Sequence, residues 1–399
     1  LRTVKKMRNG SRLLLHALTC LSLMLGLTAC SDSSDRATEL PPEAPSALGA
    51  FGVGHSSFSA IDPLRDNRTL PVEVWYPVDA ADRQDAAERT TYELAAGIGL
   101  PSEVAVDDLP VSGRSEQLLL VFSHGYGGIN TASVALMEIL ASHGFIVIAP
   151  EHSGNSQSGN DDSFDEAAAN RVPDVSFLID TMIRRSNDPD DRFYRRIRED
   201  RVGVVGHSFG GMTAAGMAAG WAGAQPDPRV AAIIPTSAVF RAELQKDDRS
   251  GPNAGFSREQ LERIGIPTML MGGTDDTDVF IVNNSIAFDE IINAPVVYQV
   301  DIIGANHNHF VANICDIGNL LIDLGILQES WPAIGAEDLL EPYAVTCTVD
   351  AFPIEEVVRL QNLYVVAFFR RHLLDDERYE FYLGPEYADG EPAATVTVK

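Results

Sequence analysis

Lysine and cysteine are scarce in this sequence. Lysine occurs only at positions 5, 6, 246 and 399, and acidic residues outnumber basic ones, which gives a formal net charge of −27. A chain this acidic lacks the positive patches that hold phosphate groups, which argues against nucleic-acid binding and against binding of the folded part to anionic lipid. Cys/His zinc spacings, a phosphate-binding loop and a dinucleotide fingerprint are also missing. The sequence therefore predicts neither a metal nor a cofactor.

Long apolar runs are scarce too, and one of them lies near the N-terminus. Basic residues precede the run Leu13–Leu27, which is short for a membrane span and fits a signal peptide. The run ends in Leu-Thr-Ala-Cys, which resembles a bacterial lipobox and implies cleavage before Cys30 and acylation of its thiol. An ordinary signal peptide that leaves Cys30 free is the alternative. Ser31, by resemblance to Gram-negative sorting, favours the outer membrane.

These features divide the chain into three parts. We expect a lipoprotein-type signal peptide over residues 1–29, a flexible polar tether over 30–47 and a single catalytic domain over 48–399. The lipid anchor is the only membrane contact that we expect, and the folded part is expected to be a monomer at the cell envelope, or to be extracellular.

The remaining two cysteines form an even pair. Cys315 and Cys347 in an exported protein suggest a disulfide, and closure of a loop of this size stabilises a fold by about 3–4 kcal/mol. The bridge would hold the segment that follows His307. Two free buried thiols are the alternative.

Apolar runs alternate with helical patterns along the chain. Strands are expected at Leu70–Tyr76, Gln117–Phe122, Phe145–Ala149, Arg201–Val205, Val230–Pro235, Ile266–Met271 and Val296–Ile303. Helices are expected near Thr131–Ser142, Val172–Arg185, Gly211–Ala219 and Glu355–Leu374. This order predicts an α/β fold with a mostly parallel central sheet flanked by helices. Two long insertions, Asp79–Ser115 and Cys315–Pro353, are expected either to rim a pocket or to pad the surface.

The sequence VGHSFGG places Ser208 in a G-x-S-x-G pattern between a strand and a helix of small residues. Gly206 and Gly210 allow a strand to turn sharply into a helix, which is the geometry of a serine hydrolase nucleophile. The serine would then lie at a helix N-terminus, where unpaired N–H groups favour developing negative charge.

A serine nucleophile of this type requires an acid and then a histidine later in the chain. The turn GGTDDTD follows a predicted strand, and a Gly-x-x-Asp count selects Asp276, with Asp275 as the alternative. The loop GANHNHF follows the next strand and offers His307, which we prefer, and His309, which could instead line the pocket.

The tetrahedral oxyanion needs two N–H donors. One is the amide of Phe209, which follows the nucleophile. The second is expected from the turn SHGYGG after the strand Gln117–Phe122, with the amide of Tyr126 as donor. A plain glycine turn is the alternative reading of that segment.

With these motifs placed, the chain resembles an α/β-hydrolase. More narrowly, it resembles the branch of platelet-activating-factor acetylhydrolases, dienelactone-hydrolase-like esterases and cutinase-like polyester hydrolases, through LVFSHGYGG, DRVGVVGHSFGGMTA, PTMLMGGTDD and GANHNHF. The resemblance implies an esterase that uses Ser208, His307 and Asp276, with Tyr126 and Phe209 as oxyanion donors and an ester as its substrate. Polyester hydrolases of this branch carry a tryptophan after the strand that corresponds to Val230–Pro235, where this chain has TSAVF and Phe240 is the nearest aromatic residue.

Overall fold

The computed structural model describes residues 43–399 except 84–87, 96–97, 115 and 248–249. The predicted signal peptide, Cys30 and most of the predicted tether lie outside the described residues. In the part that is described, no helix has the length and apolar character needed to cross a membrane.

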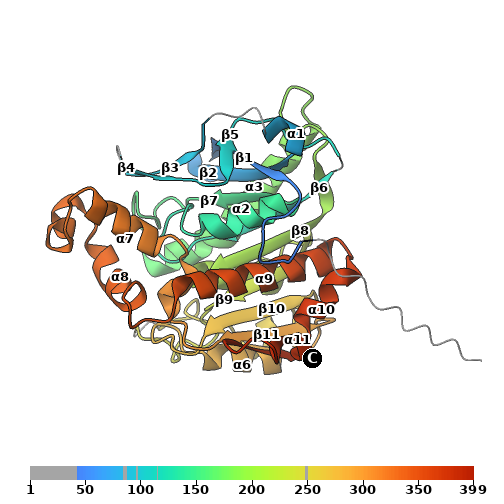
Figure 1. Ribbon diagram of the computed structural model, residues 1–399. Coiled ribbons are helices and arrows are strands. Elements are labelled where there is room, and N and C mark those ends of the chain that lie inside the picture. Colours follow the sequence, from blue (N-terminus) through green and yellow to red (C-terminus); the bar gives the residue numbers. More distant parts are fainter. Residues whose placement is uncertain (1–42, 84–87, 96–97, 115, 248–249) are drawn as a thin grey trace, which may run out of the picture. The chain divides into compact units, whose positions relative to one another are not determined.

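A ten-stranded mixed sheet forms the centre of the fold (Figure 1). Its strands are β1 (Gly52–Asp62), β2 (Arg68–Val78), β5 (Ala105–Asp107), β6 (Gln117–Ser123), β7 (Ile146–Pro150), β8 (Ile197–His207), β9 (Val230–Thr236), β10 (Thr268–Gly273), β11 (Val297–Ile302) and β12 (Ala394–Val398). They are arranged in the order β12-β11-β10-β9-β8-β6-β7-β2-β1-β5. The six strands β6 to β11 run parallel to one another. Strand β2 pairs antiparallel with β1 and β7, and β12 pairs antiparallel with β11. A separate hairpin joins β3 (Thr91–Ala95) and β4 (Ile98–Pro101).

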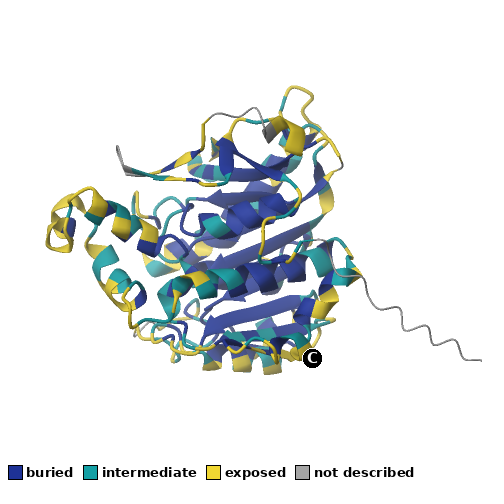
Figure 2. Ribbon diagram, in the orientation of Figure 1, coloured by how far each residue is buried: buried dark blue, intermediate teal, exposed yellow. Residues whose placement is uncertain are grey.

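Helices cover both faces of the sheet (Figure 2). The α-helices are α1 (Ala80–Arg83), α2 (Val134–Ser142), α3 (Phe164–Asn187), α4 (Phe209–Ala219), α5 (Arg258–Leu261), α6 (Val282–Glu290), α7 (Ile314–Asp323), α8 (Leu340–Thr346), α9 (Ile354–Leu373), α10 (Glu380–Leu383) and α11 (Pro385–Ala388). Short 3₁₀ helices are η1 (His307–Phe310), η2 (Gln328–Ile334), η3 (Glu337–Leu339) and η4 (Glu377–Tyr379).

The packing of strand β6 explains why its residues 118–122 are all apolar. Its residues Leu118, Leu120 and Phe122 pack with α2 and α9 on one face, whereas Leu119 and Val121 pack with α3 and α4 on the other. A parallel strand covered on both faces has no polar side, so it reads as a continuous hydrophobic run. The expected α/β class with a mostly parallel sheet is therefore confirmed.

The two insertions differ in what they do. Residues in Asp79–Ser115 form the β3–β4 hairpin and the edge strand β5, and in the described part this segment contributes no wall to the cavity beside Ser208. Residues of this segment, among them Tyr92, Glu93 and Asp107, line a different and polar pocket instead. Within the segment, β5 pairs with β1, whereas β3 and β4 pair with each other. The segment Cys315–Pro353 contains most of α7, together with η2, η3 and α8, and it does line that cavity.

Candidate active site

Ser208 lies in the sharp turn between β8 and α4. Its backbone has φ 58° and ψ −119°, a region that non-glycine residues rarely adopt and that costs about 1–3 kcal/mol. The Ser208 N–H donates to the carbonyl of Thr236 at 2.8 Å, which ties the turn to the end of β9. The rigid neighbours β8, β9 and α4 therefore hold a strained serine at the carboxyl edge of the sheet.

The two glycines of the G-x-S-x-G pattern have a steric reason. A Cβ on Gly206 would lie 2.2 Å from the carbonyl oxygen of Gly210, and a Cβ on Gly210 would lie 1.8 Å from that of Ser123. Both distances are far below van der Waals contact. The turn can form only because these two positions lack side chains, as the sequence pattern predicts.

Asp276 and His307 meet at the ends of β10 and β11. His307 Nδ1 lies 2.8 Å from Asp276 Oδ2, and Asp276 Oδ1 accepts the backbone N–H groups of Asp278 at 3.0 Å and Val279 at 2.8 Å. Burial acts to raise the pKa of Asp276, but the hydrogen bond and charge of His307 and the amide of Val279 bring it below its ordinary value. An ionised carboxylate only accepts, so the neutral His307 ring carries its proton on Nδ1 and leaves Nε2 unprotonated.

The neighbouring candidates have other partners. Asp275 is exposed and its side chain bonds to Thr274 Oγ1 at 3.0 Å. His309 is buried, accepts the N–H of Asn306 on Nδ1 at 2.9 Å and bonds through Nε2 to the carbonyl of Phe352 at 2.8 Å. The structure thus brings together Asp276 and His307, while His309 fastens the loop to the segment before α9.

Sequence reasoning missed His207, the residue before Ser208. Its ring lies 4.5 Å from the ring of His307, centroid to centroid, and 6.1 Å from that of Phe310. Burial and the neighbouring His307 lower the pKa of His207 to about 3, so it is uncharged and packs against the His307 ring. No sequence pattern distinguishes such a histidine from an ordinary strand residue.

The two expected oxyanion donors flank Ser208. Phe209 is the first residue of α4, so its N–H has no acceptor within the helix. Tyr126 lies in the turn after β6, between Gly125 and Gly127, and Gly127 has a φ of 66°. A Cβ placed on Gly125 would lie 3.5 Å from Cβ of Ser208, so this turn packs directly on Ser208.

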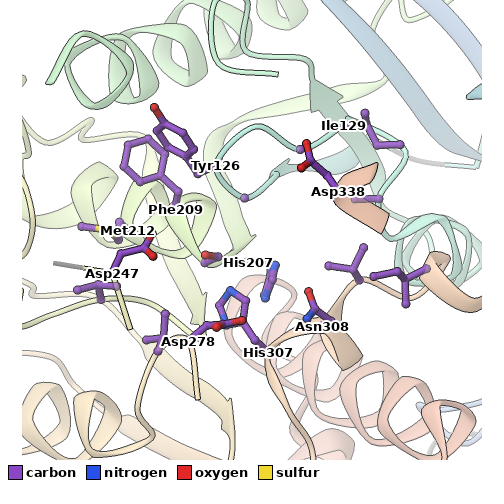
Figure 3. A pocket seen from close by; sticks show the side chains of 18 of the residues that line it. Tyr126, Ile129, His207, Phe209, Met212, Asp247, Asp278, His307, Asn308 and Asp338 are labelled. Atoms are coloured by element: carbon purple, nitrogen blue, oxygen red, sulfur yellow. The ribbon is translucent and has the colours of Figure 1, made fainter. Parts of the chain in front are cut away.

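A cavity of about 620 Å³ opens beside Ser208 and His307 (Figure 3). Aromatic side chains of Tyr126, Phe164 and Phe209 form one wall, where they contact one another. Further apolar walls come from Ile129, Met212, Val239, Val311, Ile314 and Ile317.

The mouth of the cavity is acidic. Asp278, Asp338 and Glu341 lie in its lining, together with Asp247. Lys246 lies among them, with Nζ 3.2 Å from Asp278 and 3.5 Å from Glu341. Carboxylates outnumber the ammonium group, so the entrance is negative.

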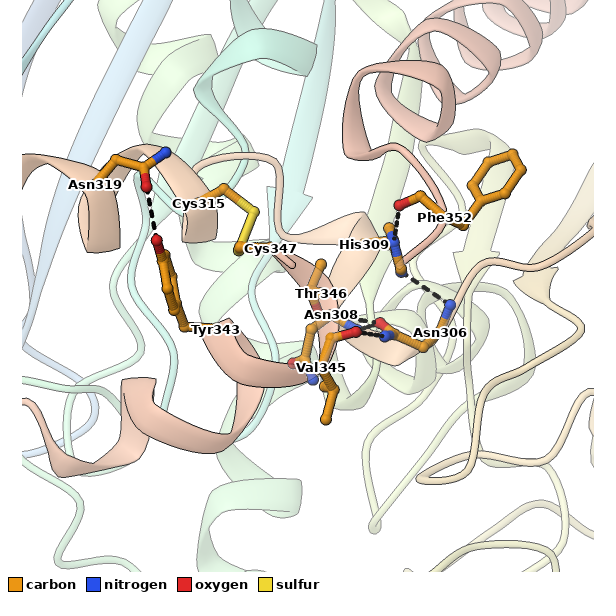
Figure 4. The surroundings of a disulfide bond; sticks show 10 residues. All are labelled: Asn306, Asn308, His309, Cys315, Asn319, Tyr343, Val345, Thr346, Cys347 and Phe352. Carbon is orange, nitrogen blue, oxygen red and sulfur yellow. Dashed lines mark hydrogen bonds between the residues drawn. A yellow bond between two sulfur atoms is a disulfide. The ribbon is translucent and has the colours of Figure 1, made fainter. Parts of the chain in front are cut away.

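The disulfide between Cys315 and Cys347 is confirmed, with Cα atoms 5.4 Å apart (Figure 4). It joins α7 to the residue that follows α8. Asn306, next to His307, donates from Nδ2 to the carbonyl of Val345 at 3.1 Å, and its Oδ1 accepts from Thr346 at 3.3 Å. The bridge therefore holds the rim of the cavity against the histidine loop.

No group of three or more His, Cys, Asp or Glu side chains in the described part of the chain is arranged to hold a metal ion.

A family model described as Chlorophyllase matches residues 112–313, slightly more than half of the chain. The matched range begins just before β6 and includes Tyr126, Ser208, Asp276 and His307. It ends before Cys315, so the disulfide and the α7–α8 rim lie outside it.

Proposed function

Because the chain belongs to the chlorophyllase family, within the α/β-hydrolase superfamily of serine esterases, we propose that it hydrolyses carboxylic esters through Ser208, His307 and Asp276. The observation that carries the proposal is the strained Ser208 turn, with its positive φ, opening on the same cavity as the paired His307. A strained serine backbone lowers the stability of the fold, and such strain is typical of residues that act in catalysis.

The reaction follows from the proton positions. His307 Nε2 takes the proton of Ser208 as the serine oxygen attacks the ester carbonyl, and Asp276 stabilises the imidazolium that forms. The N–H groups of Tyr126 and Phe209 bind the tetrahedral oxyanion, and each donor lowers the barrier by about 3–4 kcal/mol. His307 then gives the proton to the leaving alcohol, and water repeats the sequence on the acyl-enzyme.

The walls of the cavity favour a neutral, largely apolar ester. An acidic mouth repels anions, which disfavours the phosphate of a phospholipid. Phe240, the aromatic residue nearest to the tryptophan position of the polyester hydrolases, is fully buried and packs on Phe256 instead of facing the cavity. Soluble acyl esters are therefore proposed ahead of phospholipids and aromatic polyesters.

Hydrolysis of p-nitrophenyl esters of increasing acyl length tests the activity, with a phospholipid and a polyester film as further substrates. Since the family takes its name from an enzyme of chlorophyll, a chlorophyll belongs in the same panel. We expect turnover of neutral acyl esters that Ser208→Ala abolishes. Turnover that survives in Ser208→Ala, or no turnover of any ester, would contradict the proposal.

The proposal of export rests on the signal-peptide pattern around Leu13–Leu27, and that of lipid anchoring on the lipobox at Cys30. We expect cells fed an alkyne fatty acid to label the wild-type protein in the membrane fraction, and Cys30→Ser to remove the label. An unlabelled wild-type protein would contradict the anchor and leave the esterase proposal intact.

A further inference from the structure

We propose that Arg171 is a positioning residue of the oxyanion hole, which aims the N–H of Tyr126 by fixing the carbonyl group of the same peptide bond. This inference rests on the proposed function, because it assumes that Tyr126 N–H binds an oxyanion.

Arg171 lies on α3 and is fully buried behind the oxyanion turn. Its Nη1 donates to the carbonyl of His124 at 2.6 Å, and its Nη2 donates to the carbonyl of Gly125 at 3.0 Å. Nη2 also donates to Asn155 Oδ1 at 2.6 Å, and Nη1 to Ser123 Oγ at 3.2 Å. One guanidinium thus reaches three successive residues at the end of β6.

The carbonyl of Gly125 and the N–H of Tyr126 belong to one peptide unit. In a trans peptide these two groups point in opposite directions, so fixing the oxygen also fixes the N–H. The Gly125 oxygen accepts from His124 Nδ1 at 2.8 Å and from the N–H of Gly128 at 3.3 Å, in addition to Arg171. A flip of this peptide would break all three bonds and turn the Tyr126 N–H away.

The same contacts make Tyr126 a stronger donor. A positive charge at a carbonyl oxygen draws electron density from the amide, and hydrogen bonds along such a chain strengthen one another. Burial lowers the pKa of Arg171 to about 9, which still leaves it charged at neutral pH. The charge of Asp174 acts to raise the pKa of Arg171 and that of Arg68 to lower it, but the hydrogen bonds of the guanidinium go to uncharged oxygens of the turn and of Asn155. Its polarising effect therefore reaches the carbonyls of His124 and Gly125 directly.

Arg171 also contacts the residue of the second donor. Its guanidinium carbon lies 4.8 Å from the ring centroid of Phe209, a cation–π contact. The side chain therefore packs behind both Tyr126 and Phe209, the two proposed donors.

A buried chain of hydrogen bonds holds Arg171 and its turn in place. Ser123 Oγ lies 3.0 Å from His152 Nε2, and His152 Nδ1 lies 2.9 Å from Asp174 Oδ2. Burial lowers the pKa of His152 to about 4, so it is neutral: Nδ1 donates to Asp174 and Nε2 accepts from Ser123. The backbone N–H of His152 donates to His124 Nε2 at 3.1 Å, which leaves the His124 proton on Nδ1, facing Gly125.

This second Ser–His–Asp chain resembles a catalytic triad in its contacts but is sealed. Ser123, His152 and Asp174 each have 0% of their surface exposed, and none lines the cavity beside Ser208. No substrate can reach Ser123. Its role is to support the oxyanion turn.

Thionoesters provide the test, because sulfur accepts hydrogen bonds weakly and gains less from an oxyanion hole. The readouts are kcat, KM and the ratio of kcat/KM for an ester to that for its thionoester, measured with the full chain. Arg171→Met is expected to lower kcat by ~100-fold, the effect of losing about one donor, with little change in KM. The ester-to-thionoester ratio should fall by a similar factor, and Arg171→Lys should give an intermediate fall.

Arg241→Met is the matched control. Arg241 also fixes two backbone carbonyls, those of Phe240 at 3.1 Å and Phe256 at 2.6 Å, but it does not line the cavity. It should lower the melting temperature and leave the ratio unchanged. If the Arg171 variants do not fold, His124→Leu removes a different donor to Gly125 and should lower the ratio in the same direction.

A ratio that stays at the wild-type value in folded Arg171 or His124 variants would overturn the proposal, since a merely structural arginine would change stability alone. Absence of Ser208-dependent turnover in the wild-type protein would instead overturn the proposed function.

Discussion

Replacing Asp276 by asparagine exchanges one carboxylate oxygen for an NH₂ group. This change should move the proton of His307 from Nδ1 to Nε2. Asp276 Oδ1 accepts two backbone N–H groups, from Asp278 and Val279, while Oδ2 accepts from His307. In Asp276→Asn the amide oxygen must take the Oδ1 position, because an NH₂ group there would face two donors. The NH₂ group then faces His307 Nδ1, which must become an acceptor. The proton moves to Nε2, where it blocks the abstraction of the Ser208 proton.

The wrong tautomer is expected to lower kcat by about 10³–10⁴-fold, which corresponds to about 4–5.5 kcal/mol in the barrier. KM should change little, because Asp276 does not line the cavity. Steady-state hydrolysis of a p-nitrophenyl ester measures both constants. Asp275→Asn is the matched control, since this neighbouring carboxylate is exposed and accepts a hydrogen bond from Thr274. Near-wild-type kcat in Asp276→Asn, or an equal loss in Asp275→Asn, would refute the reasoning.

Four further predictions concern His307, the disulfide and the Ser208 turn. Burial acts to lower the pKa of His307, but the hydrogen bond and charge of Asp276 raise it above 6.5, so kcat/KM should fall as the pH drops through that raised pKa; an acid limb below 6.5 would contradict this. The stability contributed by the raised pKa of His307 changes with pH in the opposite direction to kcat/KM, since it is fully present below 6.5 and is lost as the pH rises through the folded pKa. The difference in unfolding free energy between wild type and His307→Ala should therefore become smaller at alkaline pH. Breaking the Cys315–Cys347 bridge with paired alanines should cost about 3–4 kcal/mol by the loop-closure model for a separation of 32 residues, measured by denaturant unfolding, and an unchanged midpoint would count against it. Gly210→Ala should abolish folding or activity because its Cβ would lie 1.8 Å from the Ser123 carbonyl oxygen, and a folded, active variant would show that the turn can relax.

The parallel strands of the sheet could be predicted because burial on both faces leaves a local record. Strand β6 reads as a run of apolar residues, and β8 to β11 are recognised in the same way. Strands β1 and β12 were not predicted. Their burial alternates or is partial, since β12 lies at one edge of the sheet and β1 next to the other. Such strands are fixed by pairing with distant partners and not by their own composition.

The proposed site residues could be named from motif and chain order, since each follows a strand that reads clearly. What could not be predicted is the support behind them. Arg171 lies 46 residues from Gly125 in the chain, and His207 meets His307 only in the folded sheet. Polar contacts of this range leave no periodic pattern in a sequence.

Mass spectrometry of the protein after reaction with a fluorophosphonate tests the central claim most directly. An activated serine should gain one adduct, and it should be found on the peptide that contains Ser208. His307→Ala should slow the labelling strongly, and Ser208→Ala should prevent it. An adduct on another serine, or labelling that persists in Ser208→Ala, would contradict the account.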